Sequence, residues 1–169
     1  MAHPSEILSQ ILDPESARVC RSLIPATWWE GVGRVFLTNE MPEGHEKSLG
    51  VAYVNVPQGE IRRSYIFLHK EAIEKGAKLL AAPELGFSYE DALEATKATV
   101  LFHELGHHAA ENLFGVEREY ELAEEEILFF RNFIARRFPH LKEKKVKSLV
   151  DVAPLPEQKP KQLYSPPRD

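Results

Sequence analysis

The chain of 169 residues contains a single cysteine, Cys20. One thiol forms no disulfide within the chain, and it excludes zinc sites built from Cys-x-x-Cys pairs. A protein without a disulfide framework fits a reducing compartment. This absence predicts a cytoplasmic protein.

Long apolar runs are also missing from the sequence. No segment approaches the roughly 18 apolar residues that a membrane-spanning helix requires. The first residues, MAHPSEILSQILDPESARV, lack the basic and apolar segments of a secretory signal peptide. No membrane partner is therefore expected.

An excess of positive charge is the third missing feature, since the formal net charge is −5. The chain as a whole therefore offers no basic field for nucleic acid. Residues 131–147 are locally basic, with seven basic residues and one acid. A solvated helix face near its C-terminal end explains this stretch better than a nucleic-acid or membrane surface does. A nucleic-acid partner is thus not expected, and the sequence does not indicate the oligomeric state.

The order of helical and strand patterns predicts one α+β domain over residues 1–150, followed by a proline-rich flexible tail over residues 151–169. Two short helices are expected first, then about three strands in an antiparallel or mixed sheet, then three helices. The strands are expected at 33–38, 48–56 and 61–69, and the helices at 5–12, 14–23, 70–81, 89–113 and 116–138. The second and third strands should pair as a hairpin.

The segment LFHELGHH, residues 101–108, falls on the long fourth helix and carries the clearest chemical signal. His103 and His107 are four residues apart, so both imidazoles lie on one face of a helix and can share one zinc ion. Glu104 is next to them and can act as general base on a water at that zinc. Glycine is unfavourable inside a helix, so Gly106 indicates that this position needs a residue without a side chain, either for close packing or for access to the site. The alternative interpretation is a solvated helix face that happens to carry histidines.

A catalytic zinc usually has three protein ligands, and the sequence must supply a third. Ala110 stands where the longer motif HExxHxxGxxH has its glycine, and no cysteine follows, so the third ligand is expected to be a glutamate of the next helix. That helix offers Glu117, Glu119, Glu121, Glu124, Glu125 and Glu126.

Helix geometry favours Glu126 among these glutamates. If the two helices form an antiparallel hairpin, residues 123–127 lie level with the histidines. Glu126 falls within the apolar stripe of its helix, where a lone carboxylate would be costly without a partner. We predict Glu126 as the third ligand, and Glu124 and Glu125 stay open as alternatives.

With HELGH on one helix and a glutamate early in the next, the chain resembles the gluzincins, the thermolysin-like zinc peptidases. More closely, it resembles the ImmA/IrrE-type peptidases and the metallopeptidase domains of phage and plasmid antirestriction (ArdC-like) proteins. The resemblance covers roughly residues 48–138 and is specific at HELGH. In the family pattern Glu-x-x-Ala-[Asn/Glu], the matching segment begins at Glu126, but Phe129 and Phe130 replace the last two residues.

The resemblance implies a small zincin-like domain, with the sheet packed on the HExxH helix and the glutamate helix. It also implies that the strand at 61–69 is the sheet edge above the zinc, where a peptide substrate would add as a further strand. It further implies a peptidase with few substrates.

The function expected from these observations is a zinc-dependent endopeptidase of narrow specificity, with one zinc per chain and a peptide or protein substrate. Tyr120 is a possible transition-state stabiliser, and His108 is a second candidate. The alternatives are a core position for Tyr120 and a solvated position for His108, which points about 100° away from His107 on the helix. The pair Trp28-Trp29 is expected to form a core wall rather than a binding platform. The alternative function is a catalytically silent gluzincin scaffold that acts as a protein-binding or regulatory module.

Overall fold

The computed structural model describes residues 3–83, 86–114 and 119–141, and for residues 114 and 119–122 it describes the backbone alone. The predicted tail over residues 151–169 lies outside the described residues. The elements in chain order are α1 (Pro4–Ser9), α2 (Pro14–Leu23), the 3-10 helix η1 (Ala26–Trp29), β1 (Val32–Thr38), β2 (Gly50–Gln58), β3 (Ile61–His69), α3 (Lys70–Leu80), α4 (Tyr89–Ala109), the π-helix η3 (Ala110–Phe114) and α5 (Glu119–Arg137). The predicted α+β class is confirmed, and within the described part of the chain no helix could cross a membrane.

Local sequence signals explain where two of the helices begin. The side chain of Asp13 accepts a hydrogen bond from the Ser16 amide at 2.7 Å and caps α2, whose first residue is Pro14. The side chain of Ser88 caps α4 in the same way, through the Asp91 amide at 3.0 Å. These caps satisfy amide groups that have no partner within the helix, so each fixes a helix start.

The sheet has three strands in the order β1-β3-β2. β2 and β3 are antiparallel neighbours, so the predicted hairpin is confirmed, whereas β1 runs parallel to β3 on its other side. The expectation that the strand at 61–69 is the sheet edge is therefore wrong. β3 lies in the centre because β1 pairs with it from a distant part of the sequence, and the two edge strands are β1 and β2.

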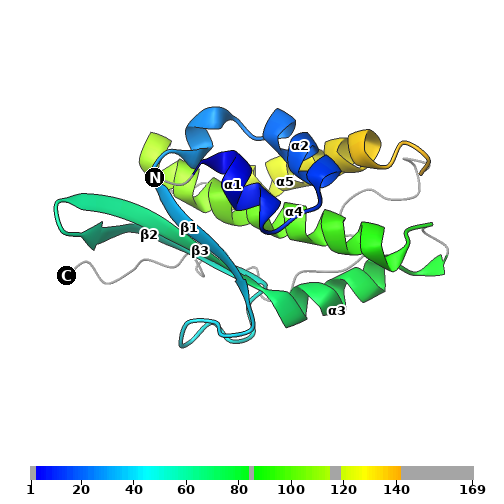
Figure 1. Ribbon diagram of the computed structural model, residues 1–169, viewed down its shortest axis with the longest axis horizontal. Helices are drawn as coiled ribbons and strands as arrows, with labels where there is room; N and C mark the ends of the chain where they lie inside the picture. Colours follow the sequence, from blue (N-terminus) through cyan, green and yellow to red (C-terminus); the bar gives the residue numbers. More distant parts are fainter. Residues whose placement is uncertain (1–2, 84–85, 115–118, 142–169) are drawn as a thin grey trace.

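Helix α4 runs through the middle of the molecule. It contacts β2 and β3 of the sheet, α3 beside the sheet, and η1, α2 and α5 on its other sides. Figure 1 shows it between the sheet and α3 on one side and the α1, α2 and α5 group on the other. Every residue from Ala98 to Gly106 is buried, so this part of the helix has no solvent face.

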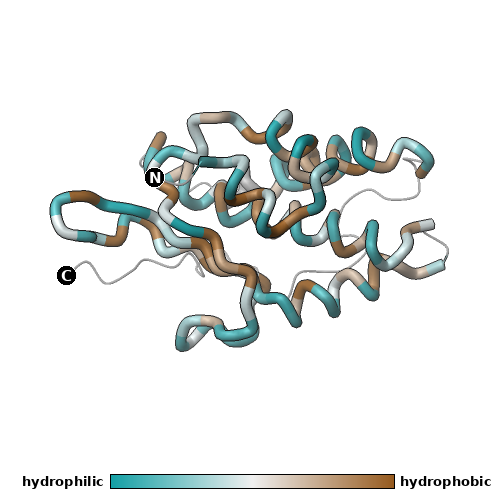
Figure 2. Tube along the Cα trace, in the orientation of Figure 1, coloured by the Kyte–Doolittle hydropathy of each residue, from teal (hydrophilic) through white to brown (hydrophobic). Residues whose placement is uncertain are grey.

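Apolar residues line the surfaces where these elements meet. Figure 2 shows apolar positions recurring among polar ones along the helices, and a concentration of apolar colour at the centre of the sheet. Such alternation is typical of helices that bury one side. In β3, Ser64, Ile66 and Leu68 are fully buried, while the residues between them are half-buried. The helices therefore cover one face of the sheet, and α4 lies directly against it.

A buried ion pair ties the turn between α1 and α2 to α4. Glu94 accepts a hydrogen bond from the Asp13 amide at 2.8 Å and pairs with Lys97 at 2.7 Å. Lys97 also donates to the carbonyl of Ile11 at 2.6 Å. Both charged side chains are nearly buried, so each neutralises the charge of the other.

The Glu94→Ala substitution is expected to lower the free energy of unfolding by about 3 kcal/mol, because it leaves a buried ammonium group and a backbone amide without their partner. Urea denaturation measures this change. Glu40→Ala, at an exposed loop position, is the control and is expected to change stability by less than about 0.5 kcal/mol. Equal effects of the two substitutions would contradict the structural role of the pair.

Candidate functional site

The two histidines of the HELGH segment converge at the α4–α5 side of the core. The Nε2 atoms of His103 and His107 are 3.0 Å apart, and the two rings are nearly perpendicular, at 87°. Two nitrogens that bind one tetrahedral zinc at 2.0–2.1 Å lie roughly 3.3 Å apart. The pair thus comes within a few tenths of an ångström of the spacing that zinc requires, as the i, i+4 pattern predicted.

The electrostatics of this pair favour an uncharged ring at His107. The pKa of His107 lies well below its usual value, because burial disfavours the imidazolium ion and because His103 repels a second positive charge. A neutral imidazole is the form that donates a lone pair to a metal ion. His107 is therefore held in the protonation state that metal binding needs.

Glu104 is buried beside the histidines, with 3% of its surface exposed, and it faces the start of β2. A Cβ atom added at Gly50 would lie 3.0 Å from Cγ of Glu104 and 3.0 Å from Cγ1 of Val100. Glycine at this position therefore lets the first residue of an edge strand approach α4 closely. The carboxylate lies against this backbone, 3.1 Å from the same added atom.

Glu126 is brought to the histidines, as the apolar stripe of its helix predicted. Its Oε1 atom lies 2.6 Å from Nδ1 of His103, and 4% of the residue is exposed. The contact uses Nδ1, whereas Nε2 of the same ring faces His107. The role of Glu126 as third zinc ligand stays a prediction. Among the residues that the structure describes, no three His, Cys, Asp or Glu residues form a group that could hold a metal ion.

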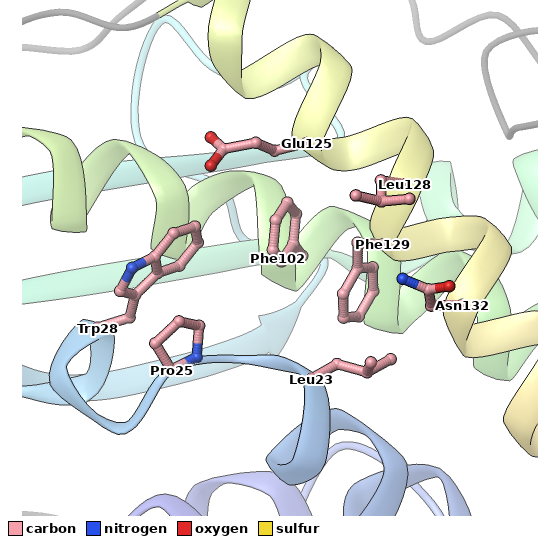
Figure 3. A pocket seen from close by; sticks show the side chains of 8 residues that line it. All are labelled: Leu23, Pro25, Trp28, Phe102, Glu125, Leu128, Phe129 and Asn132. Atoms are coloured by element: carbon pink, nitrogen blue, oxygen red, sulfur yellow. The ribbon is translucent and has the colours of Figure 1, made fainter.

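The alternative glutamates lie elsewhere on α5. Glu124 is exposed, and Glu125 is half-buried. Glu125 lines a cavity of about 190 Å³ together with Trp28 and Phe102, and Figure 3 shows its side chain on the α5 side of this cavity. The walls of this cavity come from Leu23, Pro25, Trp28, Phe102, Glu125, Leu128, Phe129 and Asn132. The side chains of Glu117, Glu119, Tyr120 and Glu121 lie outside the described residues.

Aromatic packing holds α4 and α5 together next to the histidines. The rings of Phe102 and Phe129 stack with centroids 4.4 Å apart and an angle of 13° between their planes. The Trp28 ring follows at 5.2 Å from Phe102. Trp28 and Trp29 are both buried, which confirms the prediction of a core wall. Phe102 precedes His103 and Phe129 follows Glu126 by one turn, so this stack sets the position of one helix against the other.

His108 points away from the histidine pair and into the sheet. Its Nε2 lies 2.7 Å from the carbonyl oxygen of Glu30, and its Nδ1 lies 2.6 Å from the hydroxyl of Ser64. Because a carbonyl only accepts, Nε2 carries the proton and the Ser64 hydroxyl donates to Nδ1. Burial also lowers the pKa of His108, so the ring stays neutral. His108 is thus a core residue, and the expectations of an oxyanion donor or a solvated residue are both wrong.

The contacts of His108 form a polar chain that sequence reasoning missed. Ser64 also accepts a hydrogen bond from the amide of Asn55 at 3.1 Å. Asn55 has a φ of 56° and lies at the register shift between Tyr53 and Val56 of β2. Asparagine tolerates this left-handed conformation better than most residues. The sequence signal for this polar chain was Ser64 itself, a serine on the inner face of a strand, where an apolar residue is usual.

Comparison of the chain with protein-family models, with curated proteins and with solved structures finds no match.

Gly50 and Gly76 are expected to respond oppositely to alanine. Gly50→Ala should destabilise the protein by about 1–3 kcal/mol, because the new methyl group would overlap buried atoms of Glu104 and Val100. Gly76→Ala, inside α3, meets only ordinary contact with Thr96 at 3.7 Å and should stabilise by up to about 1 kcal/mol. Chemical denaturation measures both, and stabilisation by Gly50→Ala would contradict the close approach of β2 to α4.

A double-mutant cycle on His108→Ala and Ser64→Ala should show coupling of about 1 kcal/mol or more, because each residue is the hydrogen-bond partner of the other. His108→Ala alone is expected to destabilise by about 2–4 kcal/mol, since it also opens a cavity and leaves the Glu30 carbonyl unpaired. His140→Ala, at an exposed position, is the control. Urea denaturation measures the free energy of unfolding of each variant. If the effects of the two substitutions were strictly additive, the interaction between His108 and Ser64 would not contribute to stability.

Proposed function

We propose that the protein is a zinc-dependent endopeptidase of narrow specificity, with His103 and His107 as zinc ligands and Glu104 as general base. The observation that carries this proposal is the 3.0 Å approach of the two Nε2 atoms, beside a buried glutamate on the same helix. In HExxH zinc hydrolases, two such imidazoles are zinc ligands and the adjacent glutamate is the general base. The likeness to gluzincins, and to the ImmA/IrrE-type and ArdC-like peptidases, is part of the proposal.

The residues of the chain have separate roles in this proposal. Zinc, when bound, would supply Lewis acidity toward the scissile carbonyl. Glu104 would take a proton from the attacking water and pass it to the leaving amine. Its position beside the backbone of Gly50 keeps the carboxylate at the start of β2. Tyr120 remains a possible donor to the developing oxyanion.

The edge of β2 is the proposed place for the substrate backbone. β2 is an edge strand of the three-stranded sheet, and its first residue touches Glu104. An extended peptide could add to this edge through main-chain hydrogen bonds, and its scissile bond would then pass near the carboxylate. The substrate is therefore proposed to be an extended peptide or a protein segment that can become extended. A cytoplasmic location fits the composition.

One observation favours a second candidate function. The described residues bring together two histidines but no group of three ligands, and two imidazoles alone form a weaker site than three protein ligands do. A catalytically silent gluzincin scaffold, acting as a protein-binding or regulatory module, would need no complete zinc site. The two functions differ in zinc content and in the effect of changing Glu104.

The test measures zinc per chain and the cleavage of a mixture of fluorescence-quenched peptides by untagged protein. The wild-type protein is expected to hold about one zinc, and His103→Ala is expected to hold almost none. Glu104→Gln should retain zinc and lose activity by about 10²-fold or more, because it removes only the proton acceptor. Glu90→Gln, at an exposed position of α4, should match the wild type in both measurements.

The outcomes separate the two candidate functions. Wild-type protein that binds zinc but cleaves none of the peptides or protein substrates offered would favour the silent scaffold. A Glu104→Gln variant with full activity would overturn the proposed mechanism. Wild-type protein that binds no zinc would overturn the metallopeptidase proposal as a whole.

A further inference from the structure

We propose that Glu126 is a positioning residue that holds the ring of His103, and that it does not itself bind the metal ion. This inference rests on the zinc site proposed above and assigns one of its residues a different role from the one that spacing predicted. In this role the carboxylate accepts the Nδ1 proton of His103. The ring then presents the bare Nε2 atom toward His107.

The geometry of the imidazole ring separates the two possible roles. Nδ1 and Nε2 lie on different edges of the ring, and their lone pairs point in different directions. Glu126 lies 2.6 Å from Nδ1, and His107 lies 3.0 Å from Nε2. His103 and His107 would hold a metal ion through their Nε2 atoms, whereas the Glu126 carboxylate oxygen lies at the other nitrogen of the His103 ring. Histidines that bind metals commonly donate their other ring N–H to a carboxylate in this manner.

Burial makes the contact strong and specific. His103 is 8% exposed and Glu126 is 4% exposed, and the neighbours of Glu126 on its helix include the buried rings of Phe129 and Phe130. A carboxylate in such surroundings requires a partner, and a bond of 2.6 Å to a ring N–H is in the range of charge-assisted hydrogen bonds. The pairing fixes the His103 tautomer with its proton on Nδ1. It also raises the basicity of Nε2 toward a metal ion.

The packing of α5 on α4 keeps Glu126 at this place. Phe129, one turn after Glu126, stacks on Phe102, which directly precedes His103. The stack and the hydrogen bond therefore link the same two helical turns. For its carboxylate to reach the Nε2 side of His103, Glu126 would have to break its hydrogen bond, and one of the two buried side chains would have to rotate. In the positioning role, Glu126 keeps its hydrogen bond to His103, and neither side chain has to rotate.

The experiment compares the wild type with Glu126→Gln, Glu126→Leu and the control Glu90→Gln. Glutamine keeps an oxygen that accepts the Nδ1 proton, whereas leucine removes the acceptor while filling the space. Long-range ¹H–¹⁵N correlation spectra of the metal-free proteins report which nitrogen of His103 carries a proton. Titration with Co²⁺, a spectroscopic substitute for zinc, reports both the affinity and the set of ligands. Circular dichroism reports whether each variant is folded.

The expected result is that all four proteins bind one Co²⁺ ion with the same visible spectrum. Glu126→Leu should bind it roughly 10–100-fold more weakly, which is the usual effect of losing such an outer contact. Glu126→Gln should lose only a few-fold because it keeps the hydrogen bond. In the metal-free wild type, His103 should carry its proton on Nδ1, and Glu126→Leu should lose this preference.

A visible spectrum that changes in intensity and position in Glu126→Gln would overturn the inference, because it would show that a ligand has been replaced. An Nδ1 signal of His103 that is unaffected by Glu126→Leu would overturn it too. If Glu126→Leu does not fold, the spectrum of the Glu126→Gln variant decides the question alone. Wild-type protein that binds metal but cleaves no peptide would overturn only the peptidase proposal. Wild-type protein that binds no Co²⁺ or Zn²⁺ would overturn both.

Discussion

The burial of α4 on all sides between Ala98 and Gly106 is the constraint on which the rest of the structure depends. His103, Glu104 and His108 of this helix are buried, and a buried polar group without a partner is costly. Neighbouring elements accommodate these side chains. α5 supplies Glu126 as the hydrogen-bond partner of His103, and β3 supplies Ser64 as a partner of His108. β2 leaves space for the Glu104 side chain because Gly50 has no side chain of its own. The polar residues of one helix thus determine which residues can stand opposite them.

The sequence was sufficient to predict the features that depend on short-range rules. Asp13 and Ser88 were recognisable as caps because capping depends on a few consecutive residues. The facing of His103 and His107 followed from helical spacing. Glu126 could be separated from Glu124 and Glu125 because an apolar stripe repeats along its helix, and its carboxylate contacts His103 in the structure. These predictions needed only the geometry of single helices.

The remaining features depend on long-range strand pairing, on burial by distant elements or on the rotation of individual side chains. The parallel pairing of β1 with β3 left no local signal, so the central position of β3 could not be predicted. A helical wheel gave His108 a solvent face, but α4 has no such face at Gly106 or along the eight residues before it. The choice between Nδ1 and Nε2 of His103 depends on the rotation of one ring. No pattern of residue types encodes that rotation.

The same burial that stabilises the core also prepares the histidine pair. Two imidazolium ions with nitrogens 3.0 Å apart would repel each other strongly in a medium of low polarity, so folding disfavours the doubly charged pair. The Glu126 carboxylate favours a proton on Nδ1 of His103, and the low pKa of His107 leaves that second ring neutral. The 3.0 Å contact is a hydrogen bond, so one proton lies between the two Nε2 atoms. A cation that displaced this proton would meet a lone pair on each ring. Core packing and the proposed metal site therefore make compatible demands on this helix, so the proposed site needs no separate support from a loop.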